Sequence, residues 1–312
     1  MYIGNGAYCY ANSASMFVKG IGEEVSPSLL EVLSGVGLGV TMYGNGSIFL
    51  HNNTADPDVA ISNALKMLGY SFVEEKSNSA DVMPMNELKE VLKTSTAILG
   101  PVDMGYLTYS PNHQYAKGAD HYVLAYDIDE HFVYVHDPAS FPYVRLPLEK
   151  LELAWKADDI PYGRGPFQYW HSIQKINTPS EEEIYRQSIE YFQHLYEETG
   201  EIGAKIGAKT GREAIDHFVE KIQNGQVSEA AVGNLKYFVF QLGAKRANDF
   251  SRYFEKNHRD LSELKKKQAE ILGLCHSLTV EEEFKELAKA LQEFGKVEEE
   301  FENSLLSIKV LV

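Results

Sequence analysis

The distribution of proline divides this chain into two parts that must fold differently. All 11 prolines lie at or before Pro179, so the 133 residues from 180 to 312 contain none. Proline disrupts helix interiors because it lacks the backbone N–H and clashes with the preceding turn. A proline-free stretch of this length therefore favours long helices. Because compact domains usually contain about 100 to 200 residues, we expect two domains, at 1–178 and 179–312.

The second part has the periodicity of an all-α domain. It opens with Ser180-Glu181-Glu182-Glu183, which matches a capping box, in which a hydroxyl and an acid satisfy free N–H groups at a helix start. Further helical patterns lie at about 208–223, 228–256, 259–275 and 280–308. Three roles remain open for this domain: a lid over a cleft, recognition of an acceptor, or a homodimer interface.

The first part mixes helical and extended patterns. The spacing of apolar residues after Cys9 predicts a helix of about three turns, with Ala14, Phe17, Val18 and Ile21 on its buried face. Other helices are expected at 26–33, 57–68, 85–92 and 148–155, and strands at 38–43, 97–102, 122–128, 131–138 and 143–148. We expect loops from 156 to 179. This order predicts an α+β domain followed by the all-α helical domain.

Charge and hydropathy limit the partners. The net charge is −16, which disfavours binding to the phosphates of nucleic acid. No apolar run approaches the roughly 20 residues that cross a bilayer. The first residues also lack the basic segment and apolar run of a secretory signal. We expect a cytoplasmic protein that binds neither nucleic acid nor a membrane.

Cys9 is the first candidate for chemistry. Cys9 and Cys275 are the two cysteines of the chain, too few for a disulfide framework. Cys9 follows a glycine-rich turn and begins the first predicted helix. Unpaired N–H groups and partial positive charge at a helix start stabilise a thiolate. Cys9 is therefore either a nucleophile or a small buried core residue, as most free cysteines are.

His121 and Asp137 lie at the two ends of the predicted hairpin. A turn centred near 129 pairs residues whose numbers sum to 258 or 259, so His121 faces Asp137 or its neighbour. An aspartate bonded to imidazole Nδ1 leaves Nε2 free to take a proton from a nucleophile. With Cys9, these residues predict a catalytic triad. Taken one at a time, each residue also has a purely structural interpretation: His121 as a strand-start residue bonded to the backbone, and Asp137 as part of an Asp-Pro turn.

A zinc site is the competing chemical interpretation. Cys9, His121, His136 and Asp137 would be its ligands, but the sequence contains neither CxxC nor HExxH. The glycines at 35, 37 and 39 lack the lysine of a phosphate-binding loop. We therefore expect no metal and no cofactor.

Four segments resemble papain-like cysteine enzymes of the bacteriocin-processing peptidase type, and more closely the family of the butirosin biosynthesis protein H N-terminal domain. They are CYANS at 9–13, LLEVLSGVGLG at 29–39, DHYVLAYD at 120–127 and VYVHDP at 133–138. The resemblance covers about 1–150 and implies a papain-like fold. It also implies that Cys9 attacks an acyl carbonyl, that His121 moves the proton and that Asp137 orients His121.

The resemblance implies acyl transfer in bacterial secondary metabolism, from a small-molecule or carrier-bound thioester to an amine acceptor. The acidic net charge counts against an acidic carrier protein as donor. A papain-like cysteine peptidase or amidase is the second hypothesis, and a binding or assembly module that does not use its thiol is the third.

One position departs from the family pattern. Papain-type enzymes place an oxyanion-hole glutamine about six residues before the cysteine, and Ile3 stands there. Asn5 is the candidate for an amide donor to the oxyanion, together with the Cys9 backbone N–H.

Overall fold

The chain forms two compact units that are interleaved in sequence. The computed structural model describes residues 1–4 and 7–309. The first unit comprises Met1–Leu30 and Asp56–Ser180, and the second comprises Glu31–Ala55 and the chain from Glu181 onward. The predicted division into 1–178 and 179–312 is therefore wrong for Glu31–Ala55, which we call the returning segment. Its strands and a buried carboxylate complete the second unit, and no composition shift marks it in the sequence.

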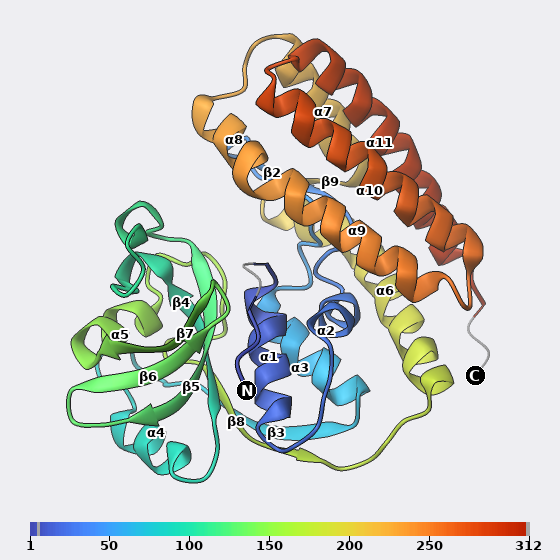
Figure 1. Cartoon of the computed structure of the whole chain (residues 1–312). Helices are drawn as coiled ribbons and strands as arrows, with labels where there is room; N and C mark the ends of the chain where they lie inside the picture. Colours follow the sequence, from blue (N-terminus) through green and yellow to red (C-terminus); the bar gives the residue numbers. More distant parts are fainter. Residues whose placement is uncertain (5–6, 310–312) are drawn as a thin grey trace. The chain divides into compact units, whose positions relative to one another are not determined.

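The first unit is built on a six-stranded sheet in which neighbouring strands pair antiparallel (Figure 1). Across the sheet the strands are β3 (Tyr70–Glu75), β8 (Tyr169–Lys175), β4 (Ala97–Asp103), β5 (Asp120–Ile128), β6 (Phe132–Asp137) and β7 (Phe141–Pro147). Strand β8 lies in the range expected to be loop, and β3 was not predicted. Both are as long as other strands of this sheet that the sequence predicts, but β8 pairs with β3 and β4, which lie roughly 70 to 105 residues earlier, so no adjacent hairpin marks either strand.

Helices cover both faces of this sheet. Helix α1 (Cys9–Lys19) packs against β4 and β5 and contacts α3 (Pro57–Met67). On the other face, α4 (Met85–Leu92) and α5 (Leu148–Lys156) share an apolar core with the sheet. Ile21, predicted to lie on the buried face of the first helix, lies beyond the end of α1 and is 42% exposed.

The second unit is mostly helical. Its helices are α6 (Glu181–Lys205), α7 (Gly211–Gln223), α8 (Glu229–Asn234), the π-helix η3 (Leu235–Val239), α9 (Phe240–Phe254), α10 (Arg259–Val280) and α11 (Phe284–Leu306). A three-stranded sheet accompanies them, in the order β2 (Ile48–Phe49), β1 (Thr41–Met42) and β9 (Lys209–Thr210). The expected helical domain at 179–312 is confirmed apart from β9, but the second unit is not all-α, because the returning segment adds β1 and β2. The chain as a whole is mixed α/β with a helical C-terminal region.

A buried ion pair fixes the returning segment in the second unit. Arg246 Nε of α9 donates to Glu31 Oε1 at 2.7 Å, and its Nη1 donates to the Leu50 carbonyl at 3.3 Å. Glu31 lies in α2 (Pro27–Ser34), which crosses the boundary between the units. Both charged side chains are buried. This pair explains why a segment so early in the chain belongs with the C-terminal helices.

Candidate active site

A strained turn positions Cys9 at the start of α1. Tyr8, the residue before it, has φ 58° and ψ 52°, a left-handed conformation that is unfavourable for a residue with a Cβ. The Tyr8 carbonyl accepts hydrogen bonds from the Asn12 backbone N–H at 2.8 Å and from Asn12 Nδ2 at 3.0 Å. These bonds close the first turn, and Cys9 is partly exposed at its N-terminal end.

His121 and Asp137 meet across β5 and β6. His121 Nε2 lies 2.6 Å from Asp137 Oδ1, and both side chains are buried. In the observed register Leu124 pairs with His136, so the numbers of paired residues sum to 260. Continuing this register places Asp137 opposite Val123. Asp137 is therefore the diagonal neighbour of His121, two residues away along β5. The predicted sums of 258 and 259 are therefore wrong. The turn is centred between Glu130 and His131, at least one residue further along than the sequence suggested, and a bulge between Ala125 and Asp127 precedes it in β5.

The ring nitrogen that contacts Asp137 also differs from the prediction. Asp137 binds Nε2 of His121, not Nδ1, so Nδ1 is the nitrogen that remains for the nucleophile. Burial lowers the pKa of His121. The charge and hydrogen bond of Asp137, with a side-chain hydrogen bond to Cys9, outweigh this effect and raise the pKa well above its ordinary value. The imidazole of His121 is therefore able to hold a proton beside Cys9 at neutral pH.

Three donors hold the Asp137 carboxylate. His121 Nε2 and the Ala139 backbone N–H bind Oδ1, the latter at 2.7 Å, and the Tyr109 hydroxyl donates to Oδ2 at 2.7 Å. Burial raises the pKa of Asp137, but these partners reverse the shift, and the net pKa is lowered. Asp137 therefore stays ionised opposite His121. No sequence pattern indicates Tyr109, which lies in a loop without periodicity.

His136 lies away from this group. Its ring stacks on Tyr126 with centroids 4.7 Å apart and meets Tyr143 edge-on at 4.5 Å. In the ranges that the structure describes, no three His, Cys, Asp or Glu side chains gather as a metal site. The oxyanion candidate Asn5 lies outside the described residues. Among the helices within those ranges, none is long and apolar enough to cross a lipid bilayer.

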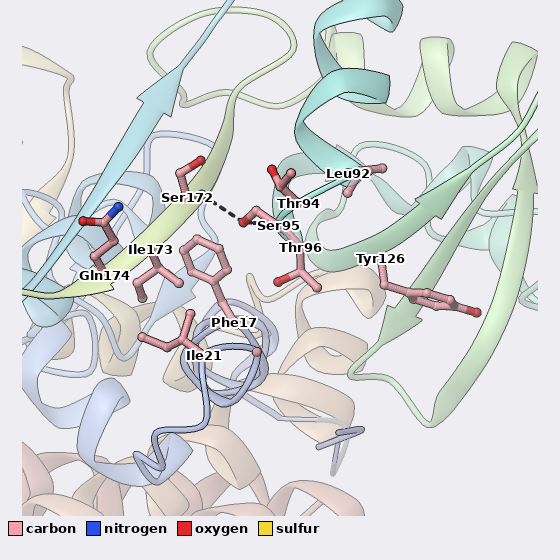
Figure 2. A pocket seen from close by; sticks show the side chains of 11 residues that line it. Phe17, Ile21, Leu92, Thr94, Ser95, Thr96, Tyr126, Ser172, Ile173 and Gln174 are labelled. Atoms are coloured by element: carbon pink, nitrogen blue, oxygen red, sulfur yellow. Dashed lines mark hydrogen bonds between the residues drawn. The ribbon is translucent and has the colours of Figure 1, made fainter.

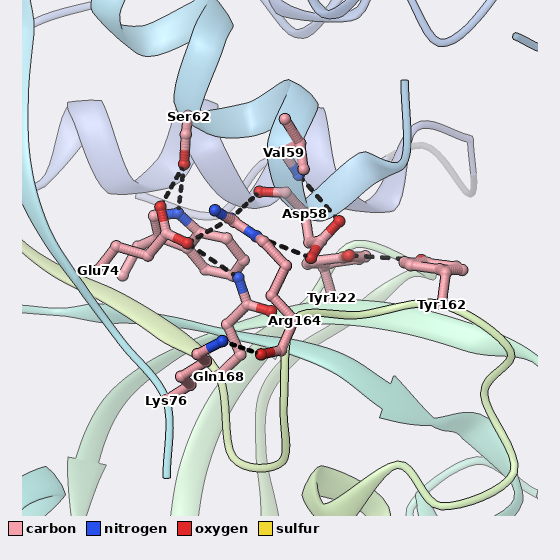
Figure 3. A network of polar contacts seen from close by, with 10 residues as sticks. Asp58, Val59, Ser62, Glu74, Lys76, Tyr122, Tyr162, Arg164 and Gln168 are labelled. Carbon is pink, nitrogen blue, oxygen red and sulfur yellow. Dashed lines mark hydrogen bonds and ion pairs between the residues drawn. The ribbon is translucent and has the colours of Figure 1, made fainter. Parts of the chain in front are cut away.

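A network of polar contacts fixes the loop between α5 and β8 (Figure 3). Arg164 Nε donates to Asp58 Oδ2 at 3.1 Å, and Arg164 Nη2 donates to the Asp58 carbonyl at 2.8 Å. The same guanidinium pairs with Glu74, whose other carboxylate oxygen accepts a bond from the Ser62 hydroxyl at 2.7 Å. The buried carboxylate of Asp58 thus holds the middle of the loop against α3.

This loop also reaches the residue beside His121. Tyr162 donates to Asp120 Oδ2 at 2.5 Å, and its hydroxyl lies 3.3 Å from that of Tyr122. Asp120 and Tyr122 flank His121 in β5. Together these contacts fix the strand on both sides of the histidine.

A separate groove opens at the other end of α1 (Figure 2). Its volume is about 460 Å³, and it is lined by Phe17, Gly20, Ile21, Leu92, Thr94, Ser95, Thr96, Tyr126, Ser172, Ile173 and Gln174. Phe17 follows Cys9 by eight residues, which corresponds to about 12 Å along a helix. Because Cys9 is not part of its lining, the groove is distinct from the site at the start of α1.

This chain is similar in sequence to a curated protein and to a family model, and in structure to a crystal structure. It is 40% identical over 308 residues to the uncharacterized protein YobF of Bacillus subtilis (strain 168), which covers 99% of both chains. Residues 205–306 match the family described as the YobF C-terminal domain. A crystal structure described as a C39-like peptidase from Bacillus anthracis is 16% identical, with a TM-score of 0.38, covering 56% of this chain and 95% of that chain. Neither YobF description names a reaction.

Proposed function

This chain belongs to the YobF family, and we propose that it is a cysteine-dependent acyl-transfer enzyme of the papain-like type. Cys9 is the nucleophile, His121 the general base and acid, and Asp137 the residue that orients His121. The observation that carries the proposal is the position of His121, which binds Asp137 through Nε2 and also bonds to Cys9. A nucleophile, a base and an orienting acid in this order are the arrangement that thiol catalysis needs.

The reaction begins from a Cys9 thiolate beside a protonated His121. The sulfur attacks the carbonyl carbon of an amide or a thioester, and backbone N–H groups at the start of α1 stabilise the oxyanion. When the tetrahedral intermediate collapses, His121 gives its proton to the departing amine or thiol, and the acyl group remains on Cys9 as a thioester. An incoming water or amine then gives a proton to His121 and attacks this thioester, which releases Cys9 as the thiolate.

The acceptor distinguishes a transferase from a peptidase or amidase. The similarity of the segments at 120–127 and 133–138 to the butirosin family favours an amine acceptor and a small-molecule or carrier-bound thioester donor. Incubation of an acyl thioester with and without an amine separates the two reactions. An amide product that depends on the amine marks a transferase, whereas free acid in both incubations marks a hydrolase.

Alkylation of Cys9 tests the proposal without a known substrate. Iodoacetamide is applied across a pH series, and modification of each cysteine is followed by mass spectrometry. Cys275 is an internal control because it is buried, and burial raises the pKa of its thiol to about 12. We expect Cys9 to react rapidly below pH 7, and His121→Gln to remove this reactivity. Alkylation of Cys9 at pH 7 that is no faster than that of a free thiol, and that His121→Gln leaves unchanged, would favour instead a binding or assembly module that does not use the thiol.

A further inference from the structure

The geometry around Asp137 points to a fourth member of the site. We propose that Tyr109 is a positioning residue, whose hydroxyl holds the Asp137 carboxylate in the orientation that binds His121. This inference rests on the proposed function, since it assigns Tyr109 a role in the chemistry of Cys9. The Tyr109 hydroxyl binds Asp137, so it acts on His121 and Cys9 through that carboxylate.

The two carboxylate oxygens of Asp137 have different partners. Oδ1 accepts from His121 and from the Ala139 backbone N–H, whereas in the described part of the chain Oδ2 accepts from the Tyr109 hydroxyl alone. Asp137 is 1% exposed, so water has little access to replace a lost donor. A buried acceptor without its donor is costly, and the carboxyl group would rotate to find another partner. The Tyr109 bond therefore keeps Oδ1 directed at His121.

Tyr109 lies in the connection between β4 and β5 and is held in place by Phe141 of β7. Its ring packs against Phe141 with centroids 5.7 Å apart. At the base of the connection, Asp103 Oδ1 accepts from the backbone N–H of Gly105 at 2.7 Å and of Gly118 at 3.0 Å. This carboxylate closes the loop on itself. The connection that leads into His121 thus also carries the residue that binds its partner.

The electrostatic surroundings of Tyr109 make its hydroxyl the hydrogen-bond donor to Asp137. Burial, followed by the charge of Asp137, raises the pKa of Tyr109 well above its ordinary value, so the phenol keeps its proton and donates it. The bond in turn helps to lower the pKa of Asp137. A carboxylate kept ionised beside the imidazole favours the protonated form of His121. Loss of the Tyr109 hydroxyl should therefore make the pair of Cys9 thiolate and protonated His121 less stable.

The test is the variant Tyr109→Phe, which removes one oxygen and retains the ring against Phe141. The matched control is Tyr115→Phe in the same connection, where the side chain is 83% exposed. Two quantities are measured: the rate of Cys9 alkylation across pH, and the titration of His121 by NMR of labelled imidazole. Because hydrogen bonds to charged groups are among the stronger ones in proteins, we expect alkylation at pH 7 to be about tenfold slower in Tyr109→Phe. The His121 midpoint should fall by about one pH unit, and the control should match the wild type.

The outcomes separate this inference from the proposed function. An unchanged His121 titration in Tyr109→Phe overturns the role of Tyr109, even if Cys9 is reactive in the wild type. An ordinary alkylation profile of wild-type Cys9 contradicts the proposed function, while the His121 titration still reports on Tyr109. Tryptophan fluorescence checks the fold, because Trp155 and Trp170 both lie in the first unit. If Tyr109→Phe loses that fluorescence signature, the residue is a folding determinant and the inference is wrong.

Discussion

Replacement of Arg246 by methionine should destabilise the second unit by about 4 kcal/mol at pH 7. Arg246 and Glu31 are 7% and 0% exposed, so the change leaves a buried carboxylate without its cation. The second oxygen of Glu31 already lacks a hydrogen-bond partner among the described residues. Removal of one member of a buried ion pair commonly costs about 3–5 kcal/mol.

Protonation sets an upper limit to this cost and makes it depend on pH. A buried carboxyl that has lost its cation avoids the charge by binding a proton. At pH 7 this costs about 1.4 kcal/mol for each of the roughly 2.7 pH units that separate pH 7 from an ordinary glutamate midpoint, or about 4 kcal/mol. At pH 5 the same calculation gives about 1 kcal/mol. Relative to the wild type, Arg246→Met should therefore regain about 3 kcal/mol as the pH falls from 7 to 5.

Urea unfolding measures both effects. Far-ultraviolet circular dichroism follows mainly the helices of the second unit, and tryptophan fluorescence follows the first unit separately. The control is the double variant Arg246→Met with Glu31→Gln, which has no carboxyl at this position and should lose the recovery at pH 5. A cost below about 1 kcal/mol at pH 7, or an equal cost at both pH values, would refute the reasoning.

Three further predictions concern the site and the second unit. Asp137→Asn should leave Cys9 as the remaining group that opposes the effect of burial on His121, so the pKa of His121 should fall and alkylation at pH 7 should slow at least about tenfold; an unchanged NMR titration would contradict this. Burial, followed by a neighbouring arginine, lowers the pKa of His51 to about 3. The unfolded chain therefore binds this proton first, and stability in urea should fall by up to about 1.4 kcal/mol per pH unit below pH 6.5 in the wild type but not in His51→Gln. Gly35 has φ +71°, and an added Cβ would meet a leucine of α6; Gly35→Ala should cost about 2 kcal/mol, and an unshifted urea midpoint would show that the site relaxes.

Local patterns were sufficient for much of the fold. The helix expected at 85–92 is confirmed as α4, because its signal lies within eight consecutive residues. The two strands of the hairpin were recognisable for the same reason, since each is an unbroken apolar run beside a short turn. The contact between His121 and Asp137 could also be anticipated despite the error in register. Direct and diagonal neighbours on one face are both within reach of an imidazole, so the prediction tolerated a shift.

Features that depend on distant partners could not be predicted. Glu31 and Arg246 are separated by 215 residues, and neither has a neighbour in sequence that indicates the pairing. The loop position of Tyr109 carries no periodicity that would connect it with Asp137. The choice between the two nitrogens of His121 depends on the direction from which each partner approaches. This direction is a property of the assembled sheet and not of the hairpin alone.

The returning segment also constrains the order in which the protein can be completed during synthesis. Chains emerge from the ribosome N-terminus first, and domains usually fold as units as they appear. Residues 31–55 emerge before most of the first unit, yet the helices that they pack with are the last to be translated. The second unit therefore cannot close until translation is nearly finished. For the same reason, a single gene fusion cannot transplant residues 205–306 with their complete core, because the strands β1 and β2 would be left behind.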